Sequence, residues 1–367
     1  MTIRARWHIL LRARGALTRT LLIFGAVAVA VPLLLRFLGF DARSALVALW
    51  SGSIGSGYAL TSGTLVRATP LILTGLSVAL AFRAGVFNIG AEGQFLVGAA
   101  AATAVALVPG LARHHAAVLL ALVAGSVAGA FWAAIAAVLR ARFHVLEVLS
   151  TILLNFVGSY LVSYLVRGPL QEPLHIYPQS SAIDLAARLP RFGSTSRLHA
   201  GFPLAVVVAI ATWWFLRFTA AGFRIRAVGA NADAARSAGL INVTRATTQA
   251  LLVSGALAGL AGAIEVTGVT YALYENISPG YGYTGIAVAL LARLDPLGVV
   301  ASGILFGALE AGATAMQRDA NVPSVTVSIV EALIIIATVI VWPSTVGREP
   351  PARPDDSPST ADSVGGT

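Results

Sequence analysis

Two reactive residue types are absent from this chain of 367 residues. It has no cysteine, and every one of its 25 basic residues is arginine, so lysine is absent too. Without cysteine there is no disulfide framework and no thiolate site for a metal or for redox chemistry. Without lysine there is no Schiff base, and no P-loop, because its lysine contacts the nucleotide phosphates. If nucleotide hydrolysis drives this protein, another chain performs it, and we expect this chain to bind no cofactor.

Charge is also scarce. Only 11% of the residues are charged and 57% are hydrophobic, whereas a soluble domain carries about 25% charged residues. Several apolar runs reach the roughly 20 residues that cross a bilayer. The sequence therefore predicts an integral membrane protein in contact with lipid. Arginines at the ends of membrane helices explain the net charge of +9 better than a nucleic-acid partner does.

We predict an all-α bundle of about ten transmembrane helices with interrupted helices and an internal repeat. The expected spans lie near 20–38, 65–82, 95–110, 116–138, 150–166, 202–218, 247–267, 283–293, 297–315 and 324–342. Residues 39–64 leave room for an additional partial helix.

The arginines of the N-terminal tail, residues 1–19, predict that both termini are cytoplasmic. Residues 20–343 form the membrane domain, with an external loop at 168–201 and a cytoplasmic loop at 219–246. The proline-, serine- and aspartate-rich tail at 344–367 is expected to be disordered and cytoplasmic.

The chain contains a short internal repeat. Residues 74–83, "TGLSVALAFR", match residues 284–293, "TGIAVALLAR", at six of ten positions. A polar, glycine-containing break follows each copy. Corresponding interrupted helices in two halves are typical of transporters. The predicted topology makes the copies parallel, whereas an inverted pair would require a miscounted helix between them.

The break after the first copy, "FNIGAEGQF", contains three polar side chains, Asn88, Glu92 and Gln94. They could cap the broken helix by hydrogen-bonding freed backbone groups, or they could line a polar path, because irregular backbone at membrane depth needs protein or water around it. A glutamate in a membrane needs a partner. Arg83 is the nearest candidate partner for Glu92 in the sequence.

The loop at 219–246 predicts a short helix at 232–238. Asn231 is a good N-cap, Asp233 and Arg236 suit the two ends of a helix dipole, and Gly239 suits the position just after the helix. Further arginines flank it at 224, 226 and 245. A helix this short is not stable alone, so it should pack on the membrane domain or on a partner, unless the loop lies on lipid headgroups.

Aromatic residues gather in "YALYENISPGYGY", which contains Tyr271, Tyr274, Tyr281 and Tyr283 beside Glu275. They predict either an interfacial tyrosine belt or a stacking surface for a planar solute. The remaining acids in or near predicted spans are Glu147, Glu265, Glu310 and Glu331. Such acids could relay protons in a secondary transporter. We find no spacing typical of an enzyme active site or a metal site.

The segments "LTGLSVALAFRAGVFNIGAEGQFLVGA", "RAVGANADAARSAGLINVTR" and "SPGYGYTGIAVALLARLDPLGVV" resemble the permease subunits of ABC importers for nucleosides and simple sugars. These belong to the branched-chain amino acid and ribose permease group. The resemblance spans roughly residues 70–341. It departs at Leu146-Glu147, where the family usually has Asn-Glu, and this weakens a role for that stretch in substrate contact.

The resemblance implies a bacterial inner- or plasma-membrane transport subunit that is not itself an enzyme. Its implied partners are cytoplasmic ATP-binding subunits carrying ATP and Mg, a second permease subunit (the same or a related chain) and an extracytoplasmic substrate-binding protein or lipoprotein. Residues 222–243 would be the ATPase-coupling segment, with Arg224, Arg226, Asn231, Asp233, Arg236 and Gly239 as its candidate residues. Asn88, Glu92, Gln94, Tyr274 and Tyr281 are the candidate substrate path.

Two other functions fit the residues alone. A proton-coupled secondary transporter would use the intramembrane glutamates and would work without a partner ATPase. A scaffold or receptor subunit would bind a partner and transport nothing.

Overall fold

The computed structural model describes residue 25, residues 29–111, 114, 116–239 and 241–323, and scattered positions between 325 and 336. The predicted tails at 1–19 and 344–367 lie outside the described residues. So do residues 20–24 and 26–28 of the predicted span at 20–38 and most of the predicted span at 324–342, including Glu331.

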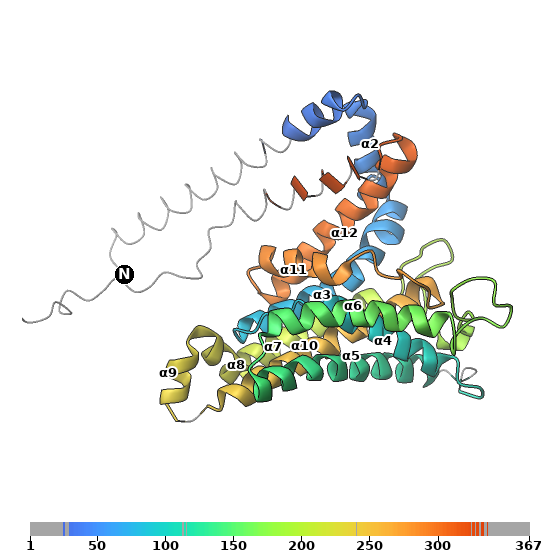
Figure 1. Ribbon diagram of the computed structural model, residues 1–367. Coiled ribbons are helices and arrows are strands. Elements are labelled where there is room, and N and C mark those ends of the chain that lie inside the picture. Colours follow the sequence, from blue (N-terminus) through green and yellow to red (C-terminus); the bar gives the residue numbers. More distant parts are fainter. Residues whose placement is uncertain are drawn as a thin grey trace, which may run out of the picture.

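The described part of the chain is helical and contains no β-strand (Figure 1). The α-helices are α2 (Ala42–Ser53), α3 (Leu65–Arg83), α4 (Ala91–Ala106), α5 (Ala116–Phe143), α6 (Glu147–Val166), α7 (Gly201–Phe218), α8 (Ala220–Ala230), α9 (Ala232–Ser237), α10 (Val243–Glu265), α11 (Tyr281–Leu291) and α12 (Pro296–Asp319). The π-helical segment η1 (Ala59–Thr64) precedes α3, the π-helical segment η3 (Val266–Thr270) follows α10, and η2 (Leu185–Ala187) is a 3₁₀ turn.

Six helices in the described residues are long and apolar enough to cross a membrane. They are 59–83, 116–143, 147–166, 201–218, 243–270 and 296–319, and each contains or closely overlaps a predicted span. Two further predicted spans, at 95–110 and 283–293, overlap the shorter helices α4 and α11. At 1.5 Å per residue, the 16 residues of α4 and the 11 residues of α11 cover about 24 Å and about 16 Å of a 30 Å bilayer core. The predicted span at 283–293 is therefore a helix that does not cross, and a total of about ten is not established.

Helices α3 and α10 lie at the centre of the bundle. Most of each is buried, whereas α5, α6 and α7 are largely exposed. Glycines let α10 approach α4 and α5 closely. A β-carbon at Gly259 would overlap the backbone of Gly125, and one at Gly98 would overlap Gly259. Small residues of this kind allow close backbone contact between membrane helices.

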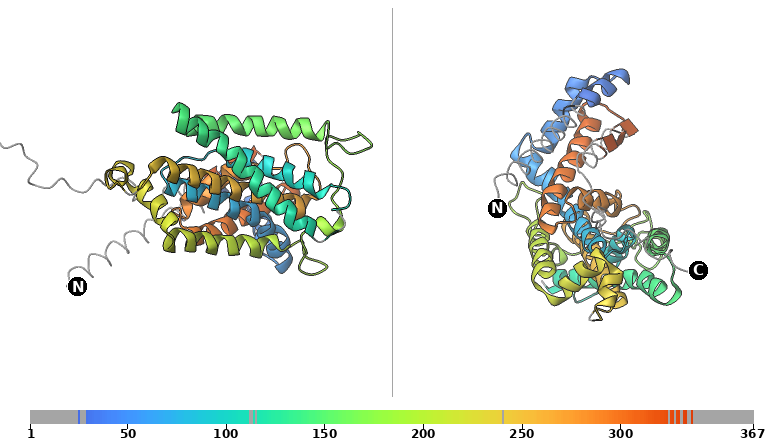
Figure 2. Two further views of the ribbon diagram at one scale, coloured as in Figure 1. Left: turned by 90° about the horizontal axis from the view of Figure 1, so that it is seen from below. Right: turned by 90° about the vertical axis from the view of Figure 1, so that its left-hand side faces the viewer.

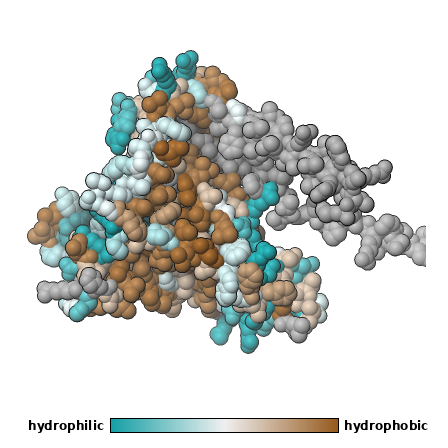
Figure 3. Space-filling view, turned by 180° about the vertical axis from the view of Figure 1, so that it is seen from behind, coloured by the Kyte–Doolittle hydropathy of each residue, from teal (hydrophilic) through white to brown (hydrophobic). Residues whose placement is uncertain are grey.

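Apolar side chains cover the outside of the bundle. Figure 2 shows α6 along one edge and α7 along the opposite edge. Exposed apolar side chains on these two helices include Leu153, Phe156, Val207 and Ile210. In Figure 3, hydrophobic residues fill the middle of one face, and polar residues gather towards its left and right edges. This pattern matches a protein that crosses a bilayer.

The two copies of the repeat lie side by side and run in the same direction. The Thr74 hydroxyl donates to the carbonyl of Tyr281 (3.0 Å), and Arg83 Nε donates to the carbonyl of Leu294 (2.7 Å). Contacts therefore advance together along α3 and α11, as the predicted parallel topology requires. The copies differ before the matching threonines. The first continues backwards as helix to residue 59, whereas the second begins at Tyr281 after a non-helical segment at 271–280.

Candidate functional site

The break between α3 and α4 is held together by side-chain amides. Asn88 donates to Gln94 Oε1 (2.9 Å) and to the hydroxyl of Ser254 (2.7 Å), and Gln94 Nε2 donates back to Asn88 Oδ1 (3.0 Å). The Gly90 N–H also donates to Asn88 Oδ1 (2.9 Å). Asn88 and Gln94 are 0% and 1% exposed. Asn88 thus satisfies one backbone N–H of the break, that of Gly90, and Gln94 holds the Asn88 side chain in place.

Glu92 joins the break to the start of α11. Its carboxylate accepts a hydrogen bond from the Gly282 N–H (2.7 Å), in the first turn of α11. Negative charge is stabilised at a helix N-terminus, where backbone N–H groups are free. The predicted partner of Glu92 was wrong. Arg83 donates instead to the carbonyl of Leu294, because α11 and the turn after it, not α4, cover that end of α3.

The starts of the two interrupted helices border a half-open cavity of about 360 Å³. This volume lies within the roughly 300–1,000 Å³ of small-molecule sites. The lining is polar and aromatic: Glu92, Leu96, Asn155, Phe156, Ser159, Tyr160, Val162, Ser163, Glu275, Asn276, Ser278 and Tyr283. Its walls come from α4, α6, α11 and the segment at 271–280.

Asn155 fastens the α6 wall of this cavity to the break. Its Oδ1 accepts from the Gly93 N–H (2.8 Å), and its Nδ2 donates to the carbonyl of Ile89 (2.9 Å) and to the hydroxyl of Tyr283 (3.2 Å). The sequence interpretation missed this residue. An asparagine inside a predicted span is a signal that could have identified it, because polar side chains in membrane helices are usually functional.

A second carboxylate of the lining belongs to an ion pair. Arg167 contacts Glu275 through two nitrogens, Nε at 2.6 Å and Nη2 at 2.9 Å, and Ser163 also donates to it. The hydrogen bond from Arg167 has the largest effect and that from Ser163 the next, and together they lower the pKa of the Glu275 carboxyl to about 2. The cavity thus combines acceptors, amides and aromatic rings, which suit a neutral solute with hydroxyl or N–H groups.

The tyrosines of the predicted belt have different surroundings. Tyr283 lines the cavity and is half-exposed, and Tyr274 is 38% exposed. Tyr281 is buried, with its ring centroid 5.8 Å from that of Phe95. It therefore does not belong to an interfacial belt. Tyr271 lies beneath the guanidinium of Arg188 (4.4 Å to the ring centroid).

The predicted short helix is present as α9. The Asn231 side chain accepts from the N–H groups of Asp233 (3.0 Å) and Ala234 (2.9 Å), Arg236 pairs with Asp233 (3.1 Å), and Gly239 has a φ of +72°. These features confirm the predicted capping. The preceding helix α8, which carries Arg224 and Arg226, was not predicted.

Helices α8 and α9 pack on the membrane domain. Ala235 of α9 lies in an apolar cluster with Val228 of α8 and Ala246 of α10. A β-carbon at Gly229 would overlap the carbonyl of Arg83, so α8 lies directly on the end of α3.

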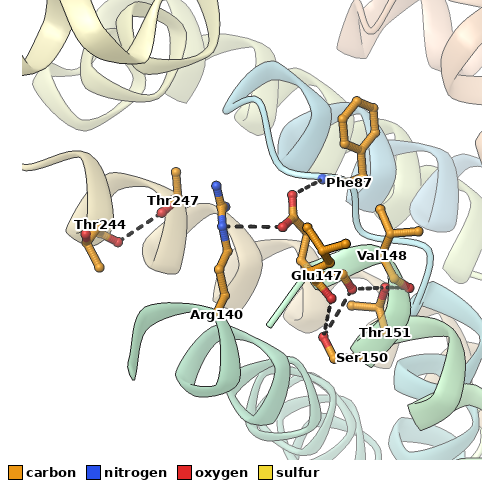
Figure 4. A network of polar contacts seen from close by, with 9 residues as sticks. Phe87, Arg140, Glu147, Val148, Ser150, Thr151, Thr244 and Thr247 are labelled. Carbon is orange, nitrogen blue, oxygen red and sulfur yellow. Dashed lines mark hydrogen bonds and ion pairs between the residues drawn. The ribbon is translucent and has the colours of Figure 1, made fainter. Parts of the chain in front are cut away.

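A polar network joins the end of α5 and the start of α6 to the segment before α4 (Figure 4). Glu147, the first residue of α6, pairs with Arg140 Nε (3.4 Å) and accepts from the Phe87 N–H (3.4 Å). Arg140, Glu147 and Arg236 line a second cavity of about 410 Å³ between α5, α6 and α10. Helix α9 thus borders the same cavity as the Arg140–Glu147 pair, which contacts the segment that precedes α4.

Within the described ranges, no three histidine, aspartate or glutamate side chains come together as possible metal ligands.

Residues 60–339 match a family described as the branched-chain amino acid transport system / permease component. The chain belongs to this family. Its multi-pass helical architecture and its interrupted helices are those of a membrane transport component.

Curated relatives match across most of the chain. It is 39% identical over 320 residues to the Guanosine ABC transporter permease protein NupP of Bacillus subtilis, covering 86% of this chain and 90% of that protein. It is 38% identical to the Glucose ABC transporter permease protein TsgB13 of Haloferax volcanii, covering 87% and 86%. It is 32% identical to the Nucleoside ABC transporter permease protein NupB of Lactococcus lactis, covering 78% and 80%. No solved structure matches the chain.

Proposed function

We propose that this chain is the membrane-spanning permease subunit of an ATP-driven importer for a nucleoside or a simple sugar. Three relatives named as permeases for guanosine, glucose and nucleosides support this assignment. The chain crosses the cell membrane several times, with at least the six long helices, and has both termini in the cytoplasm. It performs no catalysis, and ATP and Mg bind to separate ATPase subunits.

The observation that carries the proposal is the polar cavity beside the paired helix starts. Transporters place solute sites where helices are interrupted near the middle of the bilayer. Glu92 and Tyr283 line the solute path, while Asn88 and Gln94 hold the break that forms its inner wall. Tyr274 lies on the segment at 271–280, Tyr281 begins α11, and both complete the candidate path.

Helices α8 and α9 form the proposed docking surface for the ATPase subunits. The exposed pair Asp233 and Arg236 offers both charges to a partner, and Asn231 and Gly239 fix the ends of α9. Arg224 and Arg226 add positive charge on α8. The other partners are a second permease subunit and an extracytoplasmic substrate-binding protein.

The contacts support a route for mechanical coupling. When the ATPases close, α9 moves with them, and α8 transmits the movement to the end of α3 through the close contact at Gly229. Arg236 also borders the cavity lined by Arg140 and Glu147, and closure of this cavity would bring α9 against the pair that contacts Phe87 at the break. Alternating access then results from rearrangement of α4 and α11 around the solute.

Deletion and complementation in the native host test this proposal. Cells lacking the chain should lose uptake of labelled guanosine or glucose, and a tagged copy should restore it and co-purify with an ATPase. If the deleted cells take up both solutes at wild-type rates, the proposed solute class is wrong. Co-purification of an ATPase without any solute uptake would instead favour a scaffold or receptor subunit.

A further inference from the structure

The cavity that Arg140 and Arg236 line lies where two helices begin. Its volume is about 410 Å³, within the range of small-molecule sites. Glu147 is the first residue of α6, Val243 and Thr244 are the first two residues of α10, and all three line the cavity. The first N–H groups of a helix have no partner within the helix, and the helix dipole favours negative charge beside them. This position therefore suits an anion.

Arg140 carries a hydrogen-bond donor that the chain leaves unused. Its Nε pairs with Glu147 at 3.4 Å. Its Nη1 is buried, and the described residues provide no hydrogen-bond partner for it, whereas buried polar atoms in proteins almost always have one. The side chain as a whole is 32% exposed and borders the cavity, beside Thr247 in Figure 4. A turn of the guanidinium therefore presents Nη1 to an acceptor in the cavity.

Positive charge predominates around this cavity. Glu147 is the only acid in the described lining, and its carboxylate is already engaged by Arg140 and by the Phe87 N–H. Arg236 pairs with Asp233, which is not among the lining residues. Both members of that pair are exposed, and exposed ion pairs contribute little free energy. Arg236 can therefore turn towards an anion in the cavity.

The remaining lining residues indicate the chemistry of the ligand. Three threonines of α10 contribute hydroxyl groups, and apolar side chains form part of the wall: Thr244, Thr247, Thr248, Ala137, Val145 and Leu251. Arginines, hydroxyl groups and helix N-termini are the donors that bind phosphate in proteins. The volume of the cavity also leaves room for a sugar or a base attached to the phosphate.

We propose that this cavity binds a phosphate monoester of a small polar molecule, with Arg140 and Arg236 holding the phosphate group. The inference rests on the proposed function, which places the cavity on the cytoplasmic side and makes its closure part of coupling. A ligand inside the cavity opposes closure and favours the open state, so it slows import. The reaction class that supplies such a ligand is phosphoryl transfer to the imported solute, and the site therefore provides feedback from the product.

Binding to the purified complete complex is the first test. The probes are guanosine 5′-monophosphate and glucose 6-phosphate, with guanosine and glucose as unphosphorylated controls, in calorimetric titrations of the complex in phosphatidylcholine discs. Arg140→Gln should weaken phosphate-dependent binding by about 10- to 100-fold, the ratio expected when a hydrogen bond between charged groups is lost. Arg140→Lys keeps the positive charge beside Glu147 but lacks the guanidinium fork, so it should also bind more weakly than the wild type.

Arg142→Lys is the matched control for the second variant. Arg142 is an exposed arginine in the last turn of the same helix and is not among the lining residues. Its binding should equal that of the wild type. If neither probe binds the wild-type complex, or if both bind the two Arg140 variants as tightly as the wild type, the site is refuted.

Uptake in proteoliposomes tests the feedback role. Vesicles enclose ATP and Mg, with or without a probe, and the ratio of the two uptake rates of labelled guanosine is measured for each chain. The enclosed probe should lower uptake by the wild type and by Arg142→Lys, and should have little effect on Arg140→Lys. Equal ratios in all three chains would overturn the feedback role. A wild-type complex that imports neither guanosine nor glucose would refute the proposed function, whereas the binding result would stand independently.

Two other occupants of the cavity give different results. A phospholipid headgroup is a second source of the same phosphate chemistry. Arg140-dependent stabilisation by discs containing phosphatidic acid, without binding of either soluble probe, would identify a lipid and overturn the feedback role. The ATPase could instead insert an acidic side chain. A folded Arg140→Lys chain that no longer co-purifies with the ATPase, in the absence of any probe, would show this and refute the phosphate site.

Discussion

The carboxylate of Glu92 accepts a hydrogen bond from the backbone N–H of Gly282 at 2.7 Å, although 190 positions separate the two residues. This contact joins the starts of α4 and α11, the two short helices of the bundle core. It places a negative charge at the N-terminus of α11, beside a polar cavity. A movement of either helix must therefore change the wall of the cavity.

Replacing Glu92 should impair both stability and transport. Glu92→Ala leaves the buried Gly282 N–H without an acceptor, at a cost of about 1–3 kcal/mol. Glu92→Gln keeps an acceptor oxygen and should retain more uptake and a higher unfolding temperature. Thermal unfolding of the purified complex and solute uptake measure the two effects. Wild-type uptake and selectivity in Glu92→Ala would mean that this contact is not part of the solute path.

A methyl group added at Gly259 should destabilise the protein, because α10 packs closely against α5 at this position. A β-carbon there would overlap the backbone of Gly125, so Gly259→Ala should cost about 1–3 kcal/mol of stability. Gly57→Ala is the matched control, because nothing lies within 4 Å of a β-carbon at that position. The unfolding temperatures of the two variants provide the comparison. Equal temperatures would contradict the close contact.

Charge reversal on α9 should uncouple the chain from its ATPase. Arg236→Glu places two acids side by side on the docking surface. We expect it to cost at least roughly 1.4 kcal/mol of binding free energy to the ATPase, which is about tenfold in affinity. Co-purification of the ATPase and ATP-driven uptake should both fall accordingly. Arg43→Glu, at an exposed position on α2, should leave co-purification unchanged.

A double reversal separates docking from helix stability. Asp233→Arg with Arg236→Asp restores an ion pair within α9 but exchanges the charges offered to the partner. If the ATPase binds the double variant normally, the loss in Arg236→Glu came from the helix itself, and the docking role is refuted.

Lowering the pH should destabilise the folded conformation of the loop at 168–201, because His199 becomes protonated. The Gly201 N–H donates to Nδ1 of this buried ring (3.1 Å), so the ring is neutral. The pKa of His199 is lowered from its ordinary value of 6.5 to about 4. Burial is the largest cause, and the positive charges of Arg191 and Arg197 add to it. The unfolded state therefore takes up a proton at a higher pH than the folded state. The stability contributed by the neutral ring is present above pH 6.5 and is lost as the pH falls towards 4, with about 2 kcal/mol lost at pH 5.

Hydrogen exchange of peptides from this loop measures the effect, after correction for the intrinsic pH dependence of exchange. Protection should decrease between pH 7 and pH 5 in the wild type. His199→Asn keeps an acceptor near the position of Nδ1 but does not titrate, so its protection should be independent of pH. The same decrease in both proteins would exclude His199 as the cause.

Local features of the fold were predictable because they depend on neighbouring residues. The caps of α9 at Asn231 and Gly239 follow from side-chain geometry over three or four positions. The lengths of the apolar runs predicted the positions of the six long helices. The glycines around Asn88 predicted the position of the break. The parallel direction of the repeat followed from the predicted topology.

Features that depend on tertiary packing were not predictable from one sequence. The partner of Glu92 belongs to α11, and the partner of Arg83 lies in the turn after α11, both far away in the chain. The burial of Tyr281 requires Phe95 beside it. The sequence at 271–280 is apolar enough near its start to continue a helix. Contacts with the loop at 168–201, including the hydrogen bond from Ser180 N–H to the carbonyl of Leu273 (2.7 Å), hold it in a non-helical conformation.

Solute accumulation in proteoliposomes tests most directly whether this chain depends on partner ATPases. Vesicles would contain either this chain alone or its complete complex with the ATPases and second permease subunit, with the binding protein and labelled guanosine or glucose on the outer side. We expect accumulation only in vesicles that contain the complete complex and enclose ATP and Mg, and no accumulation by the chain alone under a pH gradient. Concentrative uptake by the chain alone would contradict the account.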